Sequence, residues 1–216
     1  MGGIGFGNIA WLGSSGSANN YALAFLNGEY ANTGDSGNPT PPVPRMGLDW
    51  QINFRFRLGG SHGYMWRIPT SYLDAFCFYQ YGNGTLALVS VDNFGGADPA
   101  LYFSTPVTDQ LYHEVELVYA AGVLTASLDG APAGSRNMAG FEPKGGPLVF
   151  AERSGDVRWA GTIDFYKIRI GSSWVVDYQM NNPSGNPKNA GTLGGELYYY
   201  KSSGGYPDLP PYELVA

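Results

Sequence analysis

The sequence predicts an all-β protein, an antiparallel sandwich of about ten to twelve strands. Its 216 residues include 32 glycines and 15 prolines, and both residue types are enriched in tight turns. Aromatic residues make up 15% of the chain, led by 16 tyrosines, and such side chains suit the half-buried surface of a pleated sheet. No segment of useful length has the periodicity of an amphipathic helix. A chain of this length often forms a single sandwich domain.

The clearest predicted strand covers residues 48–58. Apolar residues occupy every second position, which places on one face Leu48, Trp50, Ile52, Phe54, Phe56 and Leu58. The opposite face carries Asp49, Gln51, Asn53, Arg55 and Arg57. Because the alternation has a strict period of two, one face is expected to pack on a core while the other meets water or a partner.

Short apolar segments at regular spacing predict the other strands. They cover residues 21–26, 64–68, 75–81, 85–91, 111–119, 123–129, 147–151, 161–170, 173–180 and 197–200. Hairpin turns are predicted at Gly82-Asn83-Gly84, Ala120-Ala121-Gly122 and Asp129-Gly130. Many short strands joined by tight turns are typical of a sandwich or a barrel.

Two segments flank the predicted sandwich, which we place at residues 21–180. Residues 1–20 alternate glycines with apolar residues that suit docking onto a neighbouring subunit, namely Ile4, Phe6, Ile9, Trp11 and Leu12. The alternative is that this N-terminal arm forms a strand at the edge of the domain's own sheet. Residues 181–216 form a tail rich in proline, glycine and tyrosine, which we expect to be largely extended.

Composition disfavours several classes of partner. With 12 basic and 18 acidic residues, the formal net charge is −6, which opposes binding to a phosphate backbone. The chain has no basic amphipathic helix and no run of about 18 apolar residues, so we expect no membrane insertion. Its single cysteine, Cys77, lies in an apolar segment and is expected to be a buried thiol. Because the first basic residue is Arg45, no secretion signal is predicted, and we do not expect export by the general secretory route.

Parts of the predicted sandwich resemble a known family. Residues 111–130 contain, in order, an aromatic-His pair, a predicted strand with alternating apolar residues, a glycine turn, a second predicted strand and an Asp-Gly turn. Residues 161–170 begin with Gly-Thr-Ile-Asp. This order is similar to that of laminin G-like domains in the concanavalin A-like lectin/glucanase superfamily. Residues 21–30 resemble the first strand of that family. The resemblance covers residues 21–180 and implies a jelly-roll of two antiparallel sheets. It also implies that one concave face or loop edge is left to bind sugar, protein or nothing.

Lectin-like sandwiches normally act outside cells, whereas no secretion signal is predicted here. A bacteriophage virion protein would reconcile these expectations, because it is made in the host cytoplasm and released by lysis. We therefore expect a virion structural protein, such as a capsid decoration or tail fibre protein, held in the assembly by its terminal arms. Its partners would be other virion subunits or further copies of itself. The alternative is a glycan-binding adhesion module on a particle or cell surface, with an extracellular location.

Glycan recognition uses aromatic faces beside amide and carboxylate groups, because a pyranose presents C–H patches ringed by hydroxyls. The candidate platforms are Tyr64, Trp66, Tyr81, Tyr102 and Trp159, with Asn83, Asp92 and Asn93 as polar partners. Each of these aromatic residues has the alternative role of a core or interface residue.

Catalysis is not expected. In the glucanase branch of the resembled superfamily, three acidic residues at alternate positions on one strand carry the reaction. Glu114 and Glu116 share a face here, but the next position on that face is Val118, so the acidic series stops one residue short. We expect the pair to lie on a solvated outer face, which makes a glycoside hydrolase the least favoured function. The two histidines, His62 and His113, form no recognisable metal-binding motif.

No cofactor is predicted. Relatives of the resembled family hold calcium in loops, and Asp92, Asn93 and Asp98 offer oxygen ligands on a glycine-containing segment. Asx turns explain the same residues, so calcium binding stays an alternative.

Overall fold

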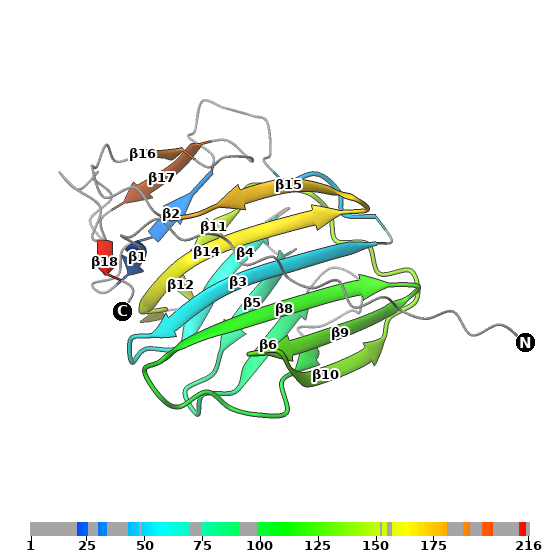
Figure 1. Ribbon diagram of the computed structural model, residues 1–216, viewed down its shortest axis with the longest axis horizontal. Coiled ribbons are helices and arrows are strands. Elements are labelled where there is room, and N and C mark those ends of the chain that lie inside the picture. The colour runs from blue at the N-terminus through cyan, green and yellow to red at the C-terminus, as the bar shows by residue number, and fades with distance from the viewer. Residues whose placement is uncertain are drawn as a thin grey trace, which may run out of the picture.

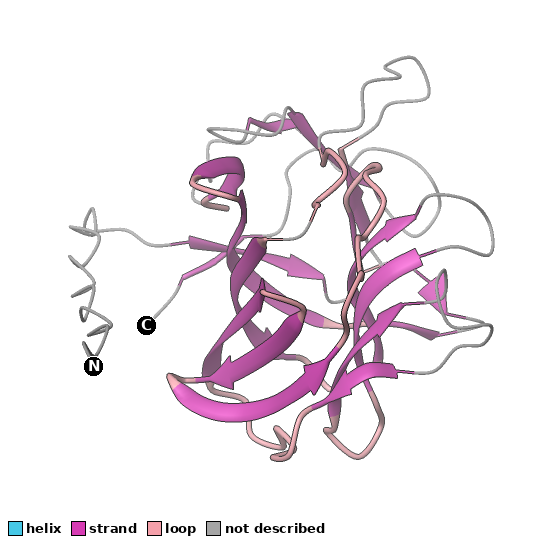
Figure 2. Cartoon of the chain, turned by 90° about the vertical axis from the view of Figure 1, so that its right-hand side faces the viewer, coloured by secondary structure: helices cyan, strands magenta, loops and turns pink. Residues whose placement is uncertain are grey.

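The structure is a computed structural model, and it describes residues 21–25, 30–33, 43–47, 49–69, 75–90, 99–151, 153–154, 157–180, 188–190, 196–200 and 212–214. Every regular element in these ranges is a β-strand, which confirms the all-β prediction. Two eight-stranded antiparallel sheets lie face to face as the two layers of a sandwich (Figures 1 and 2). Among the described residues, no helix could span a bilayer.

The two layers are the front sheet and the back sheet of Figure 1. The front sheet contains, in spatial order, β10 (Ala131–Asn137), β9 (Val123–Leu128), β8 (Tyr112–Ala120), β3 (Trp50–Leu58), β14 (Gly161–Ile170), β1 (Tyr21–Phe25) and β18 (Tyr212–Leu214), and β15 (Ser173–Tyr178) also pairs with β14. The back sheet contains β16 (Lys188–Ala190), β17 (Glu196–Tyr200), β2 (Tyr30–Asn32), β11 (Val149–Phe150), β4 (Gly63–Pro69), β5 (Ala75–Gln80), β6 (Leu86–Ser90) and β7 (Pro99–Tyr102). A separate small ribbon pairs β12 (Arg153–Ser154) with β13 (Val157–Arg158).

The strands predicted from the sequence are present, with ends that differ by a few residues. The structure adds β2, β7, β10, β12, β13, β16 and β18, which the sequence did not predict. Strand β10 has little apolar alternation, and it forms because the turn at Asp129 and Gly130 folds it back onto β9. Both turn residues have positive φ angles, 52° and 77°, as the tight Asp-Gly hairpin turn requires.

Part of the segment beyond residue 180 belongs to the sheets. Strand β17 pairs with β2, and strand β18 pairs with β1. Leu197 of β17 is buried and packs in the core. The sandwich therefore continues past the boundary that the sequence predicted, because these strands cover edges of β1 and β2. The predicted assembly arm, residues 1–20, lies outside the described residues, and its role stays a prediction.

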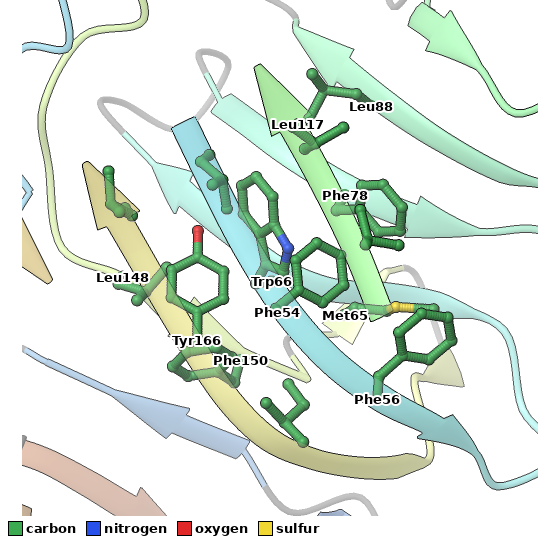
Figure 3. Close-up of a cluster of buried hydrophobic side chains, with 14 of the residues drawn as sticks. Phe54, Phe56, Met65, Trp66, Phe78, Leu88, Leu117, Leu148, Phe150 and Tyr166 are labelled. Atoms are coloured by element: carbon green, nitrogen blue, oxygen red, sulfur yellow. The ribbon is translucent and has the colours of Figure 1, made fainter. Parts of the chain in front are cut away.

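Aromatic side chains fill the space between the sheets. The ring of Phe54 on β3 lies 4.9 Å from that of Phe78 and 6.0 Å from that of Trp66, which belong to the back sheet. Trp66 lies 5.4 Å from the ring of Tyr166 on β14. These three pairs meet edge to face, and all four side chains are fully buried (Figure 3). The predicted inward face of β3 thus anchors the core, and the prediction that Cys77 is buried is also confirmed.

Candidate functional site

A depression of about 610 Å³ lies on the outer face of the front sheet, the face turned toward the reader in Figure 1. Its side chains are Asn53 and Arg55 from β3, Tyr112, Glu114 and Glu116 from β8, and Ser127 and Asp129 at the end of β9. We call this site the polar groove. It follows from the alternation of β3 and β8, since Phe54, Val115 and Leu117 are buried in the core between these positions.

Strand register sets the order of side chains in the polar groove. Asn53 lies opposite Glu116, and Glu116 lies opposite Ser127, so these three form one row across the sheet. Arg55 lies opposite Glu114 in the next row. Outward side chains on neighbouring strands are close enough to interact, and the rows therefore bring amide, carboxylate and guanidinium groups together.

Amide groups fix the carboxylate of Glu116. The Nε2 atom of Gln51 donates to Glu116 Oε1 at 2.6 Å and to Asn53 Oδ1 at 2.7 Å. Asn53 Nδ2 lies 3.5 Å from the same glutamate oxygen, and Asn53 is only 2% exposed. Because the amide donors hold the glutamate oxygen, its orientation does not depend on a ligand.

Arg55 is already paired inside the site. Its Nη1 atom donates to Asp164 Oδ2 at 3.0 Å, and its guanidinium lies 4.9 Å from the ring centroid of Tyr112. The hydroxyl of Tyr112 accepts a hydrogen bond of 3.2 Å from Thr162 Oγ1. Burial raises the pKa of Asp164, while the neighbouring Arg55 partly opposes this shift.

Burial also raises the pKa of Glu114, and the nearby charge of Arg55 lowers it by less. Glu116 and Asp129 add to the upward shift by like-charge repulsion. The pair lies on an outer face, as the sequence predicted, but side chains of neighbouring strands cover Glu114 in part. Three carboxylates and one paired arginine line the polar groove, so its local charge is negative.

His113 links three segments at one end of the polar groove. Its Nε2 atom lies 2.7 Å from Asp109 Oδ1 in the β7–β8 connection, and its Nδ1 atom lies 2.7 Å from Asp129 Oδ2 in the β9–β10 turn. The other carboxylate oxygen of Asp129 accepts a hydrogen bond of 2.8 Å from the backbone N–H of Glu114. The histidine therefore helps to orient Asp129, which lines the groove.

The predicted aromatic platform is partly assembled on the opposite side of the molecule. Tyr64 and Tyr81 lie on the outer face of the back sheet, where they form a continuous series of ring contacts with Tyr79 and Tyr102. We call these four residues the tyrosine face. The sequence pointed to Tyr64, Tyr81 and Tyr102 but not to Tyr79, although its position two residues before Tyr81 on a strand places both on one face.

Other predicted glycan-binding residues have different positions. Trp66 and Trp159 were wrong as platforms, because both are buried, and Trp159 Nε1 donates to Gln80 Oε1 at 2.8 Å. Asn83 lies in the turn after β5, where its Oδ1 accepts a hydrogen bond of 3.0 Å from the backbone N–H of Thr85. Asp92 and Asn93 lie outside the described residues, and so does the predicted calcium segment. Within the described ranges, no group of three or more His, Cys, Asp or Glu residues could hold a metal ion.

No family model matches the chain, and neither does any curated protein sequence. Solved structures do resemble it. A proposed carbohydrate binding protein from Bacteroides ovatus ATCC 8483 superimposes with a TM-score of 0.61 and 9% identity over 91% of this chain and 60% of that protein. The CBM40 domain of the Ruminococcus gnavus IT-sialidase has a TM-score of 0.53 and 10% identity over 71% of this chain and 92% of that domain.

The heptameric SAP-like pentraxin from Limulus polyphemus has a TM-score of 0.51 and 14% identity over 73% of this chain and 79% of the pentraxin. The fold is a lectin-like jelly-roll. Structures of laminin LG domains are also similar, in agreement with the resemblance read from residues 21–180. At these identities the likeness establishes the fold alone, and the chain spans about 60% of the length of the Bacteroides protein.

The polar groove was not predicted from the sequence, although the residues that form it have a recognisable pattern. The strand at residues 48–58 has a polar face with Asn53 and Arg55, and the strand at residues 111–119 has one with Glu114 and Glu116. What the sequence lacks is the pairing of these two strands, between which the chain forms strands β4 to β7 of the back sheet. The polar residues at alternate positions of these two strands are the signal from which the polar groove could have been located.

Proposed function

We propose that the protein is a glycan-binding module whose ligand lies in the polar groove. The observation that carries this proposal is the convergence of carboxylate, amide and guanidinium groups with a tyrosine in one depression on a sheet. Sugar hydroxyls donate to carboxylates and exchange hydrogen bonds with serine hydroxyls, so Glu116 and Ser127, which lie opposite each other, can bind adjacent hydroxyls, while the buried Asn53 helps to hold Glu116 in place. The lectin-like fold, shared with proteins named for carbohydrate binding, supports the same reading.

The charge of the polar groove favours neutral or amine-bearing glycans. Glu114, Glu116 and Asp129 contribute carboxylates, and the guanidinium of Arg55 is paired with Asp164. A carboxylate or sulfate on a glycan would face repulsion and would find the arginine of the groove already neutralised. Sialylated and sulfated glycans are therefore expected to bind more weakly than their neutral counterparts.

Binding is proposed rather than hydrolysis. Glu116 is held by the amide of Gln51, and Val118 occupies the next outward position of the same strand. A retaining glycosidase needs two carboxyl groups about 5–5.5 Å apart on either side of the scissile bond. Glu114 and Glu116 instead project from the same face of one strand, and the amide of Gln51 already occupies an oxygen of Glu116.

The proposal is tested on an array of neutral, amine-bearing and acidic glycans, followed by calorimetry with the best-bound oligosaccharide. Glu116→Gln is expected to raise the dissociation constant about tenfold, because the charge-assisted hydrogen bond of the carboxylate becomes a neutral one. Glu142→Gln is the matched control, since it removes a carboxylate that pairs with Arg45 outside the groove. Unchanged affinity of Glu116→Gln, or a folded protein that binds no glycan on the array, would refute the proposal.

Attachment to a virion, or to a cell surface, stays a prediction from the sequence. It depends on the arm at residues 1–20, which lies outside the described residues. A glycan-binding module is compatible with a virion or extracellular location and with association with further subunits. A particle that attaches to a surface needs both glycan binding and contacts that hold the module in the particle.

A further inference from the structure

The tyrosine face crosses the outer surface of the back sheet in one continuous row. Tyr64 on β4 lies opposite Tyr79 on β5, and their ring centroids are 5.0 Å apart. Tyr79 contacts Tyr81 at 4.9 Å, and Tyr81 contacts Tyr102 on β7 at 6.1 Å. The row extends over four adjacent strands, or roughly 14 Å at the usual spacing between strands. It lies on the side of the sandwich opposite the polar groove.

The sequence of β6 explains how the four rings form one surface. Ala87 lies between Tyr79 and Tyr102 in strand register and is fully buried. Its small side chain leaves room above β6, and Tyr81 contacts the rings on both sides of that position. Because each ring packs against another, little side-chain freedom remains to be lost when a ligand binds.

The tyrosine face presents neutral phenol groups to solvent. Tyr102 is 52% exposed, a large fraction for an aromatic side chain in this fold. Burial, together with a hydrogen bond to Tyr102, raises the pKa of Tyr81 to about 12, so its hydroxyl stays protonated at neutral pH. Arg67 places its guanidinium 5.7 Å from the ring centroid of Tyr64, which occupies one end of the row.

We propose that the tyrosine face is a second saccharide-binding surface, which takes an uncharged glycan chain lying across β4, β5 and β7. Aromatic rings stack on the C–H faces of sugars, and phenol hydroxyls can hydrogen-bond the hydroxyls at the sugar's rim. The four rings carry no charge, and the guanidinium of Arg67 contacts only the Tyr64 end of the row, so most of the row favours an uncharged ligand. The proposal shares its ligand class with the proposed function but uses none of the residues of the polar groove.

The area of the tyrosine face argues against a second copy of this chain as its occupant. An aromatic side chain offers about 150–250 Å² when fully exposed, and half-exposed or more buried rings leave the face below about 500 Å². A stable protein–protein interface needs about 800 Å² from each partner. Exposed apolar patches of a few hundred Å² are nevertheless the size of typical functional patches.

The test is affinity electrophoresis of the full chain through gels that contain laminarin, hydroxyethyl cellulose or galactomannan, three soluble neutral polysaccharides. At least one is expected to retard the protein, and Tyr102→Ala is expected to weaken that binding about five- to tenfold. Tyr102→Phe keeps the ring and is expected to retain most of the retardation. Trp174→Ala is the matched control, because Trp174 is an exposed aromatic residue on β15 of the other sheet, and it is expected to migrate as the unchanged protein does.

Several outcomes overturn the proposal. They are the absence of retardation by all three polysaccharides, equal retardation of Tyr102→Ala and the unchanged protein, or a dimer in sedimentation velocity that Tyr102→Ala converts to monomer. Loss of retardation in Glu116→Gln, with Tyr102→Ala unaffected, would assign all binding to the polar groove. Conversely, if Tyr102→Ala is no longer retarded in the gel but still binds the glycan array, the two surfaces bind independently. The proposal for either surface can then fail while the other stands. Equal thermal unfolding midpoints of the variants exclude a folding defect as the cause.

Discussion

Replacing Phe54 with alanine is expected to lower the free energy of unfolding by about 3–5 kcal/mol. The side chain of Phe54 is fully buried, and its ring contacts those of Phe78 and Trp66 on the back sheet. It also contacts Phe56 and Tyr166 on its own sheet. Loss of the ring leaves a cavity between the two sheets. The neighbouring rings cannot move to fill it, because each is packed against other core side chains. Guanidinium denaturation followed by tryptophan fluorescence measures the change.

Two variants control this experiment. Phe54→Leu keeps most of the volume and is expected to cost less than about 1.5 kcal/mol. Trp174→Ala removes a larger but 40% exposed side chain and is expected to change stability by about 0.5 kcal/mol or less. A loss below about 1 kcal/mol for Phe54→Ala would mean that the two sheets do not depend on this aromatic cluster.

The central strands could be predicted because alternation is a local signal. Residues 50–58 alternate between core and surface in the structure as they do in the sequence, except that Asn53 on the polar face is also buried. Strand β14 covers exactly the residues that the sequence indicated. Strand β10 has no such pattern, because as an edge strand it needs few apolar residues on either face. The position of β10 follows from the hairpin that joins it to β9.

The candidate sites depend on which strands become neighbours, and the sequence does not contain that information locally. Strand β3 pairs with β8, so Asn53 meets Glu116 across a long separation in the chain. On the back sheet, Tyr79 and Tyr102 come together only through the register of β5, β6 and β7. Strand alternation alone would place Tyr64 and Trp66 on one face, but a bulge in the pairing of β4 with β5 lies between them, and Trp66 is buried in the core.

The two outer faces differ in chemistry, which follows from the residues that alternate with the core. Outward positions of β3 and β8 carry amides, carboxylates and arginines, whereas the outer face of β4 and β5 carries Tyr64 and Tyr79 with Arg67 beside them. A single sandwich thus offers a surface rich in charged groups and a surface dominated by tyrosine rings on opposite sides. Two surfaces of moderate affinity can increase the overall binding to a multivalent glycan without any new contact, provided that both can be engaged at once.

The stability of the protein is expected to fall as the pH rises from about 5.5 to about 8, in part through His113. Burial lowers the pKa of His113, but the hydrogen bonds to Asp109 and Asp129 raise it by more, so the net shift is upward. Both ring nitrogens lie 2.7 Å from a carboxylate oxygen, and only the protonated imidazole can donate to both. The stability that His113 contributes is therefore fully present below its unfolded pKa of about 6.5, and it is lost as the pH rises through the folded value.

Titration of Asp109 sets the lower limit of the pH range in which its contact with His113 stabilises the protein. The hydrogen bond from His113, followed by one from the backbone N–H of Leu111, lowers the pKa of Asp109. The contribution of Asp109 is present above its unfolded pKa of about 3.9 and is lost as the pH falls through the lowered value. Glu114 and Asp164 have raised pKa values, so their ionisation also lowers the stability of the folded protein as the pH rises. A comparison with a variant is needed to separate His113 from these two groups.

His113→Gln is that variant, because glutamine can donate to one carboxylate without a charge. The unchanged protein is expected to be more stable than the variant by about 1–2 kcal/mol at pH near 5.5, a value reduced for the exposure of both aspartates. The difference should shrink toward zero near pH 8, since neutral histidine also donates only one hydrogen bond. Urea denaturation at both pH values measures it, and an NMR titration of the His113 ring checks the direction of the pKa shift. A difference that is constant with pH would contradict the double hydrogen bond, and with it the idea that His113 orients Asp129 at the end of the polar groove.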